Sequence, residues 1–196
     1  LKLHLDREPR FYACIAADRL YWRGAGVNQS NEMKEPKIIT ARKGEEFGTN
    51  LESLQSYMNQ NRSGYWLMKH IYTDLLCNKQ IEGKGDLPKP LIRMAQLYLW
   101  ASEAWNEYLE TPDDRVYAGI DKVRARAGIP DVKEAWSQHS TNPALATTQA
   151  GMRQIIRRET SIELAFEGQR FWDLRRWLEA EKELNEPLTG WNVVAA

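Results

Sequence analysis

Three of the four carboxylates in residues 149–177 are candidates for chemistry: Glu159, Glu163 and Asp173. Glu159 and Glu163 are four residues apart, which places them one turn apart on a helix, and Asp173 follows after Gly168. A pair of carboxylates can serve as general acid and general base, as in the hydrolysis of a glycosidic bond. A glycosidase is therefore one hypothesis for the chemistry of this stretch.

Buried ion pairs are the alternative use of these carboxylates, and we favour it. On a helical wheel, Glu159 falls within an apolar face and Glu163 lies beside it, so both point toward a core. Side chains one turn apart lie side by side rather than across a substrate, and an unpaired buried charge is costly. We therefore expect no enzymatic activity. The apolar face comprises Met152, Ile155, Ile156, Ile162 and Phe166, and the expected ion network comprises Glu159, Glu163, Arg170, Asp173, Arg175 and Arg176.

Aromatic side chains among polar ones form a second candidate site. Flat sugar faces stack on Trp and Tyr rings, while Asn, Asp and Arg side chains bind sugar hydroxyls. Tyr21 and Trp22 are adjacent in a loop flanked by glycines, and loops are where binding residues collect. The alternative is that both rings cover the core from outside. The candidate sugar-binding residues are Asp18, Tyr21, Trp22, Arg23 and Asn28, with Trp66 as a weaker member in a second loop.

Other kinds of site have little support in the sequence. The three histidines are isolated and lack the spacing of metal ligands, so we expect no metal site and no cofactor. Lys and Arg number 27, as do Asp and Glu, which argues against a nucleic-acid partner. Cys14 and Cys77 lie far apart, and both a disulfide and two buried thiols remain open.

Length and composition place the chain among ordinary globular domains. Its 196 residues, 42% of them hydrophobic, are enough for one domain with a core. No run approaches the roughly 18 consecutive apolar residues that a membrane-spanning helix needs. The sequence starts at Leu1 with neither an initiator Met nor a signal-peptide pattern, so we interpret it as a processed or truncated piece.

The composition and periodicity of the sequence change near residue 90. Glycines and prolines break up residues 1–90, which predicts loops with short elements at 11–17 and 65–76. The residues between 28 and 60 are polar and predict a mobile stretch. Residues 91–196 instead show the periodicity of an array of helices.

Two helices are predicted at the start of this array. The first, residues 91–109, has apolar residues over more than half of its circumference and should pack on two sides. The second, about 114–127, should begin at a cap from Thr111 or Asp113 and end at Gly128. The pair has the length of a tetratricopeptide unit but lacks its sequence pattern.

Several segments resemble one protein family in the order in which they occur. Residues 157–177, RRETSIELAFEGQRFWDLRRW, strongly resemble the C-terminal signature of the SusD/RagB family. The segments LIRMAQLYLWASEAWNE (91–107) and the following 115–128 resemble two successive helices of that family. DREPRFYACI (6–15) and GYWLMKHI (64–71) are similar to family stretches further upstream. The resemblance thus runs through nearly the whole chain.

The resemblance implies a fold and a function. The implied fold is mainly α, a tetratricopeptide-like helical array with a loop-rich N-terminal part. The implied function is that of an outer-membrane glycan-binding lipoprotein of Bacteroidetes, which delivers oligosaccharide or another nutrient ligand to a SusC-like TonB-dependent transporter without cleaving it. A helical protein-interaction module with no sugar site in this portion is the alternative.

Family members are typically more than twice as long as this chain. The resemblance therefore assigns residues 1–90 and 91–196 together to one C-terminal domain of a longer protein. Expected partners include the missing N-terminal portion, and the only expected membrane contact is a lipid anchor on that portion at the cell surface.

Overall fold

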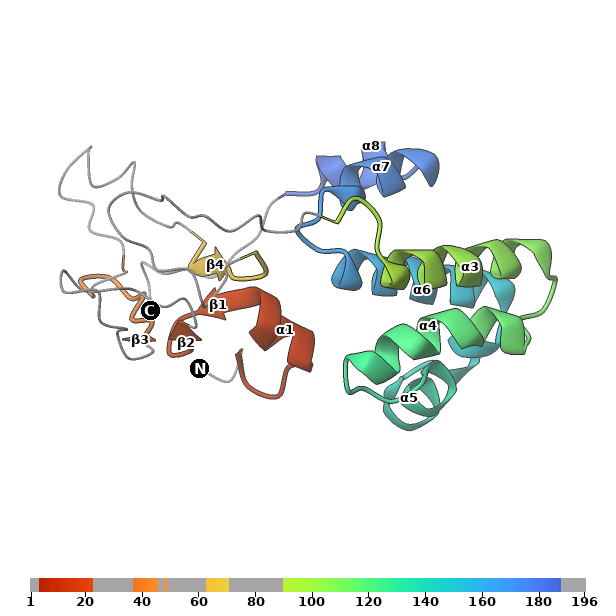
Figure 1. Ribbon diagram of the computed structural model, residues 1–196, viewed down its shortest axis with the longest axis horizontal. Helices are drawn as coiled ribbons and strands as arrows, with labels where there is room; N and C mark the ends of the chain where they lie inside the picture. The colour runs from red at the N-terminus through yellow and green to blue at the C-terminus, as the bar shows by residue number, and fades with distance from the viewer. Residues whose placement is uncertain (1–3, 23–36, 46–47, 49–62, 71–89, 188–196) are drawn as a thin grey trace. The chain divides into compact units, whose positions relative to one another are not determined.

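The chain divides into two compact units (Figure 1). Unit 1 comprises residues 1–87 and 186–196, and unit 2 comprises residues 88–185. The computed structural model describes residues 4–22, 37–45, 48, 63–70 and 90–187.

Unit 1 contains short elements. Helix α1 (Pro9–Cys14) begins with a proline. Proline suits the first helical position because a backbone N–H there would have no acceptor within the helix. The chain passes directly into strand β1 (Ile15–Ala17), which pairs antiparallel with β4 (Tyr65–Leu67). The short element predicted at 11–17 thus spans most of α1 and all of β1.

A second antiparallel pair joins β2 (Tyr21–Trp22) to β3 (Lys37–Ile38). Ala16, Ile39, Ala41 and Met68 form a small core, and the rings of Trp22 and Trp66 pack against it. The predicted mobile stretch between 28 and 60 therefore supplies a strand and core residues, because Ile39 and Ala41 are apolar positions within it. Its other residues, 28–36, 46, 47 and 49–60, lie outside the described part of the chain.

Unit 2 is built on the pair α3 (Met94–Tyr108) and α4 (Asp114–Arg126), which lie side by side in Figure 1. The carboxylate of Asp113 accepts a hydrogen bond from the backbone N–H of Arg115, and Gly128 follows α4 with φ +72°. Both predicted helices are confirmed to within three residues at each end. The two helices approach closely at Gly119, where a side chain would meet the carbonyl oxygen of Tyr98.

The chain continues through shorter helices. These are α5 (Val132–His139), the 3₁₀ helix η2 (Pro143–Thr147), α6 (Gln149–Glu163), α7 (Gln169–Arg176) and α8 (Ala180–Asn185). The side-chain oxygen of Thr148 caps α6, and Gly168 precedes α7 with φ +80°. The fold is mainly helical, as predicted.

The core of unit 2 lies between α3, α4 and α6. Its members include Leu99, Val116, Ile120, Val123, Met152, Ile155 and Ile156. Two buried polar side chains of α3 cross-link the elements, since Ser102 accepts from the N–H of Ile120 at 2.9 Å and Asn106 donates to the carbonyl of Gln149 at 3.0 Å.

The prediction that Phe166 shares the buried face of α6 is wrong. Met152, Ile155 and Ile156 are buried, but Phe166 is 50% exposed. The reason is that α6 ends at Glu163 and Phe166 has φ +67°, so the helical wheel no longer describes its direction.

Candidate functional site

The aromatic candidates of unit 1 lie on the short strands. Along β2, neighbouring side chains point to opposite sides. Tyr21 is 62% exposed, whereas Trp22 packs against the small core. Trp66 of β4 packs against the same core. Of the three predicted sugar-binding aromatics, Tyr21 is thus the one whose ring lies largely in solvent.

The structure corrects the prediction that Asp18 contacts a sugar. Asp18 is 1% exposed, and its carboxylate accepts hydrogen bonds from the N–H of Ala41 at 2.9 Å and from Nε of Arg42 at 3.3 Å. The carboxylate therefore holds the segment after β3 in place and cannot reach a ligand. Arg23 and Asn28, the remaining predicted residues, lie outside the described residues.

Glu159 and Glu163 are both buried, as the helical wheel predicts. Nη1 of Arg124 donates to Oε2 of Glu159 at 2.8 Å, and Nε of the same arginine donates to the carbonyl of Pro130 at 2.7 Å. The planar guanidinium thus links α4 to α6 and to the loop that precedes α5.

Glu163 is held by two arginines, one just before α3 and one at the end of α4. Nη1 of Arg93, just before α3, donates to it at 2.6 Å, and Arg126 at the end of α4 donates to the same oxygen. Arg93 also donates two hydrogen bonds of 2.7 Å to the carboxylate of Glu167. Burial lowers the pKa of Arg93, but its hydrogen bonds to Glu167 and Glu163 outweigh burial and leave the pKa above its ordinary value.

The predicted arginine partners of Glu159 and Glu163 are wrong, although Asp173 and Arg176 of the predicted network do pair. Arg170 pairs with Glu183 at 2.7 Å, Arg175 lies over the ring of Phe171, and Arg176 forms a two-pronged pair with Glu103 at 2.7 and 2.6 Å. The turn between α6 and α7 redirects these arginines. Asp173, the third carboxylate, accepts from Nε of Arg176 at 2.8 Å.

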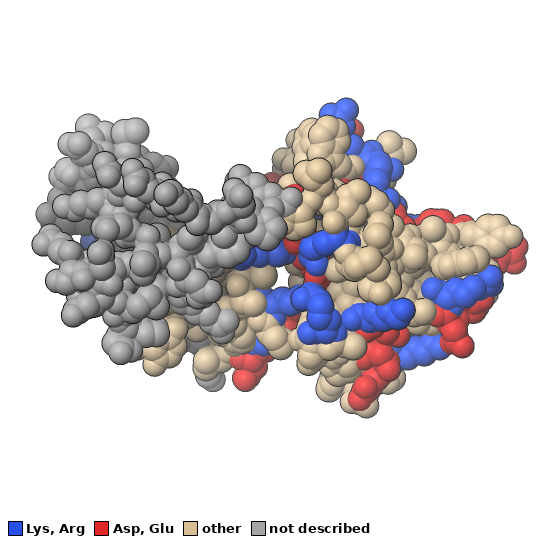
Figure 2. Space-filling model, in the orientation of Figure 1, with Lys and Arg blue, Asp and Glu red and all other residues tan. Residues whose placement is uncertain are grey.

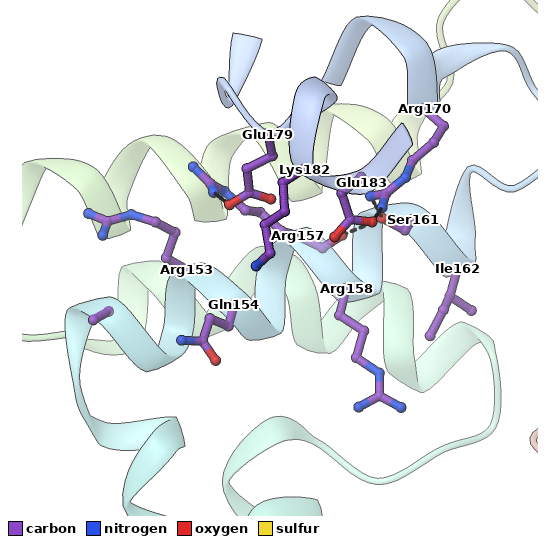
Figure 3. A pocket seen from close by; sticks show the side chains of 11 residues that line it. Arg153, Gln154, Arg157, Arg158, Ser161, Ile162, Arg170, Glu179, Lys182 and Glu183 are labelled. Carbon is purple, nitrogen blue, oxygen red and sulfur yellow. Dashed lines mark hydrogen bonds and ion pairs between the residues drawn. The ribbon is translucent and has the colours of Figure 1, made fainter. Parts of the chain in front are cut away.

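A cleft of about 1000 Å³ opens between α6 and the segment of α7 and α8 (Figure 3). We call it the α6–α8 cleft. Its lining includes five cationic side chains, Arg153, Arg157, Arg158, Arg170 and Lys182, and two carboxylates, Glu179 and Glu183. Neither Glu159 nor Glu163 lines it. The two carboxylates required by the glycosidase hypothesis are therefore buried structural groups in this fold.

Comparison with known families decides the identity of the chain. The sequence model of the SusD family matches residues 2–196. The chain belongs to the SusD family. A search of curated proteins finds no match. SusD-family proteins generally bind carbohydrate in nutrient uptake, and they are outer-membrane lipoproteins rather than enzymes.

Charged side chains of both signs lie on the visible face of the helical unit of this SusD-family chain. Figure 2 shows Lys and Arg adjoining Asp and Glu over the visible face of the helical unit, in keeping with the balanced composition. None of the helices within the described residues is long and apolar enough to cross a bilayer. In the same residues, no cluster of His, Cys, Asp and Glu has the arrangement of a metal site.

The outer face of α3 is a surface that the sequence did not identify in this SusD-family chain. Leu97, Trp100, Trp105 and Tyr108 are 43%, 36%, 37% and 77% exposed. The guanidinium of Arg115 covers one side of the Trp105 ring at 4.4 Å. The apolar excess of α3 predicts two packed sides, and Leu97, Trp105 and Tyr108 belong to the second, whereas the wheel places Trp100 in the polar stripe. The wheel could not show that this second side remains open within unit 2.

Proposed function

We propose that this chain is part of a cell-surface component that binds oligosaccharide and delivers it to a SusC-like TonB-dependent transporter. The observation that carries the proposal is the SusD-family match across residues 2–196. In this account the whole protein is held at the outer membrane by an N-terminal lipid and takes part in glycan utilisation without cutting the glycan.

Tyr21 is the proposed contact for sugar in unit 1. Its ring is 62% exposed, on a strand whose next residue, Trp22, anchors the backbone in the small core. Arg19 lies two residues before Tyr21 and forms an ion pair with Glu45. An exposed ring on an anchored strand near paired charged groups supports stacking of a sugar face with hydrogen bonds to its hydroxyls.

A titration with neutral and acidic oligosaccharides from plant, host and microbial glycans tests this proposal. We expect saturable binding by calorimetry, weakened at least about tenfold by Tyr21→Ala. Tyr108→Ala is the matched control, because it removes another exposed tyrosine from unit 2 and should leave the affinity unchanged. The proposal is wrong if the chain, shown to be folded by circular dichroism, binds none of these glycans.

The second candidate function is a helical interaction module without a sugar site in this portion. The exposed apolar side chains of α3 favour it, because exposed apolar patches mark protein interaction sites. In this case a purified SusC-like transporter would bind the wild-type chain and bind Leu97→Ser more weakly, while every glycan titration gave no signal. Sugar binding that depends on Tyr21 would instead favour the first candidate.

A further inference from the structure

The α6–α8 cleft carries more cationic than anionic side chains. Five of its lining residues are Lys or Arg, and two are Glu. The whole chain has a formal net charge of zero, so this excess is local rather than a reflection of composition. A concave surface with an excess of one sign of charge concentrates ligands of the opposite sign.

Three of the five cations already have carboxylate partners. Arg157 pairs with Glu179 at 2.6 Å and Arg170 pairs with Glu183 at 2.7 Å. Arg153 pairs with Glu107, which lies outside the cleft lining. Among the described residues, Arg158 and Lys182 have no carboxylate at ion-pair distance. The positive charge that a ligand could neutralise therefore resides on these two side chains.

The directions of these two side chains differ. Figure 3 shows Lys182 reaching from α8 toward α6, on the side where Gln154 lies, whereas Arg158 extends from α6 away from α8. A group bound between the two helices would meet the ammonium of Lys182. The side-chain amide of Gln154 can add a hydrogen bond to it.

We propose that the α6–α8 cleft binds the anionic group of an acidic oligosaccharide, a sugar carboxylate or a sulfate ester. This inference rests on the proposed function and adds a second contact, in unit 2, that is separate from Tyr21 in unit 1. The cleft volume of about 1000 Å³ is at the upper end of the range of roughly 300–1,000 Å³ for small-molecule sites, which leaves room for more than one sugar ring. A neutral glycan would leave the Lys182 charge without a partner.

The test compares acidic and neutral ligands of equal length. Oligosaccharides of galacturonic acid, sulfated galactose and unmodified galactose are titrated calorimetrically into the full chain. We expect roughly tenfold tighter binding of at least one acidic series than of the neutral one, because hydrogen bonds to charged groups are the stronger ones. The preference should shrink as NaCl rises from about 0.05 to 0.5 M. The better of the two acidic series identifies the recognised group.

Two variants localise the effect. Lys182→Gln removes the ammonium that reaches toward α6 and should abolish most of the acidic preference. Arg158→Gln removes one charge from the same cleft lining but points away from α8, and should retain the preference. Both residues are exposed, so the fold should persist in both variants, which circular dichroism verifies.

Several results would overturn the inference. Equal affinity for acidic and neutral oligosaccharides would do so while leaving the proposed function intact. Equal loss of preference in both variants would show a diffuse charge effect instead of a site. Polyglutamate binding as tightly as the acidic sugars would indicate an acidic protein partner, and inorganic sulfate competing as well as sulfated galactose would indicate a simple anion site. Absence of binding to any oligosaccharide would contradict the proposed function as well.

Discussion

Arg124 donates a hydrogen bond from Nη1 to Oε2 of Glu159 at 2.8 Å, and both side chains are less than one-tenth exposed. The pair joins α4 to α6 inside unit 2. A carboxylate in this position cannot approach a sugar, so it stabilises the fold and takes no part in catalysis. Its importance is then a matter of stability.

Removing one member of this pair should destabilise the chain strongly. Glu159→Gln leaves Arg124 buried without its counter-charge, which we expect to lower the free energy of unfolding by about 3–5 kcal/mol. Urea unfolding followed by circular dichroism measures the loss. Glu110→Gln, an exposed carboxylate in the loop after α3, is the control and should change the free energy by less than about 0.5 kcal/mol. Equal effects of the two substitutions would contradict the structural role of Glu159.

The contact between α3 and α4 should not tolerate a side chain at Gly119. In an open helix, Gly→Ala stabilises by about 1 kcal/mol through helix propensity. Here the added methyl group would meet the carbonyl oxygen of Tyr98 and the hydroxyl of Ser102. We therefore expect Gly119→Ala to destabilise by about 1–3 kcal/mol, measured by thermal unfolding. A raised melting temperature would show that the helices do not approach as closely as described.

Glu107 should contribute to the loss of stability in acid. Its hydrogen bonds from Arg153, the closest of 2.5 Å, hold the pKa of Glu107 below its ordinary value of 4.5. Because the pKa is lower in the folded state, the stabilisation is fully present above pH 4.5 and is lost as the pH falls through the folded-state pKa.

Glu107→Gln should therefore reduce the fall in melting temperature that wild type shows as the pH drops below 4.5. Thermal unfolding between about pH 3 and 7 should show a melting temperature below that of wild type at neutral pH, with the difference shrinking below pH 4.5. Glu110→Gln serves again as the control and should follow the wild-type curve. A difference that stays constant over the whole range would argue against the Arg153 interaction.

Trp177 should hold the end of α7 against α3. Its Nε1 donates to Oε1 of Glu103 at 2.7 Å, and the guanidinium groups of Arg157 and Arg176 lie 5.0 and 4.9 Å from its ring. Trp177→Phe keeps a ring but removes the donor, and a hydrogen bond to a charged group contributes about 1.5–3 kcal/mol to stability.

The matched control for this prediction is Trp172→Phe. Trp172 is 62% exposed on the same helix, whereas Trp177 is 8% exposed. Urea unfolding should give a loss near the stated range for Trp177→Phe and less than about 0.5 kcal/mol for Trp172→Phe. If the two substitutions cost the same, the contact with Glu103 does not stabilise the packing of α7.

Local signals made part of this structure predictable. Asp113 and Gly128 mark the two ends of α4, because a capping carboxylate and a residue at positive φ act on their own neighbours in sequence. The burial of Glu159 and Glu163 follows from helical periodicity alone. The short elements of unit 1 follow from the way glycines and prolines interrupt the sequence.

Predicting the partners of the buried carboxylates would require knowledge of the tertiary structure. Arg124 lies 35 residues before Glu159, and Arg93 lies 70 residues before Glu163. Proximity in sequence favoured Arg170, but the chain reverses at Phe166 and Gly168, both at positive φ. The exposure of Tyr21 beside a packed Trp22 likewise depends on strand pairing, which brings Ile39 and Ala41 to one side of β2.

The most direct test of the central claim measures binding and cleavage on the same sample. The chain is titrated calorimetrically with the oligosaccharide that it binds most tightly, and the recovered sugar is assayed for new reducing ends after prolonged incubation. The account predicts saturable binding with the oligosaccharide recovered intact. New reducing ends in proportion to the concentration of the chain, or a folded chain that binds no oligosaccharide, would contradict it.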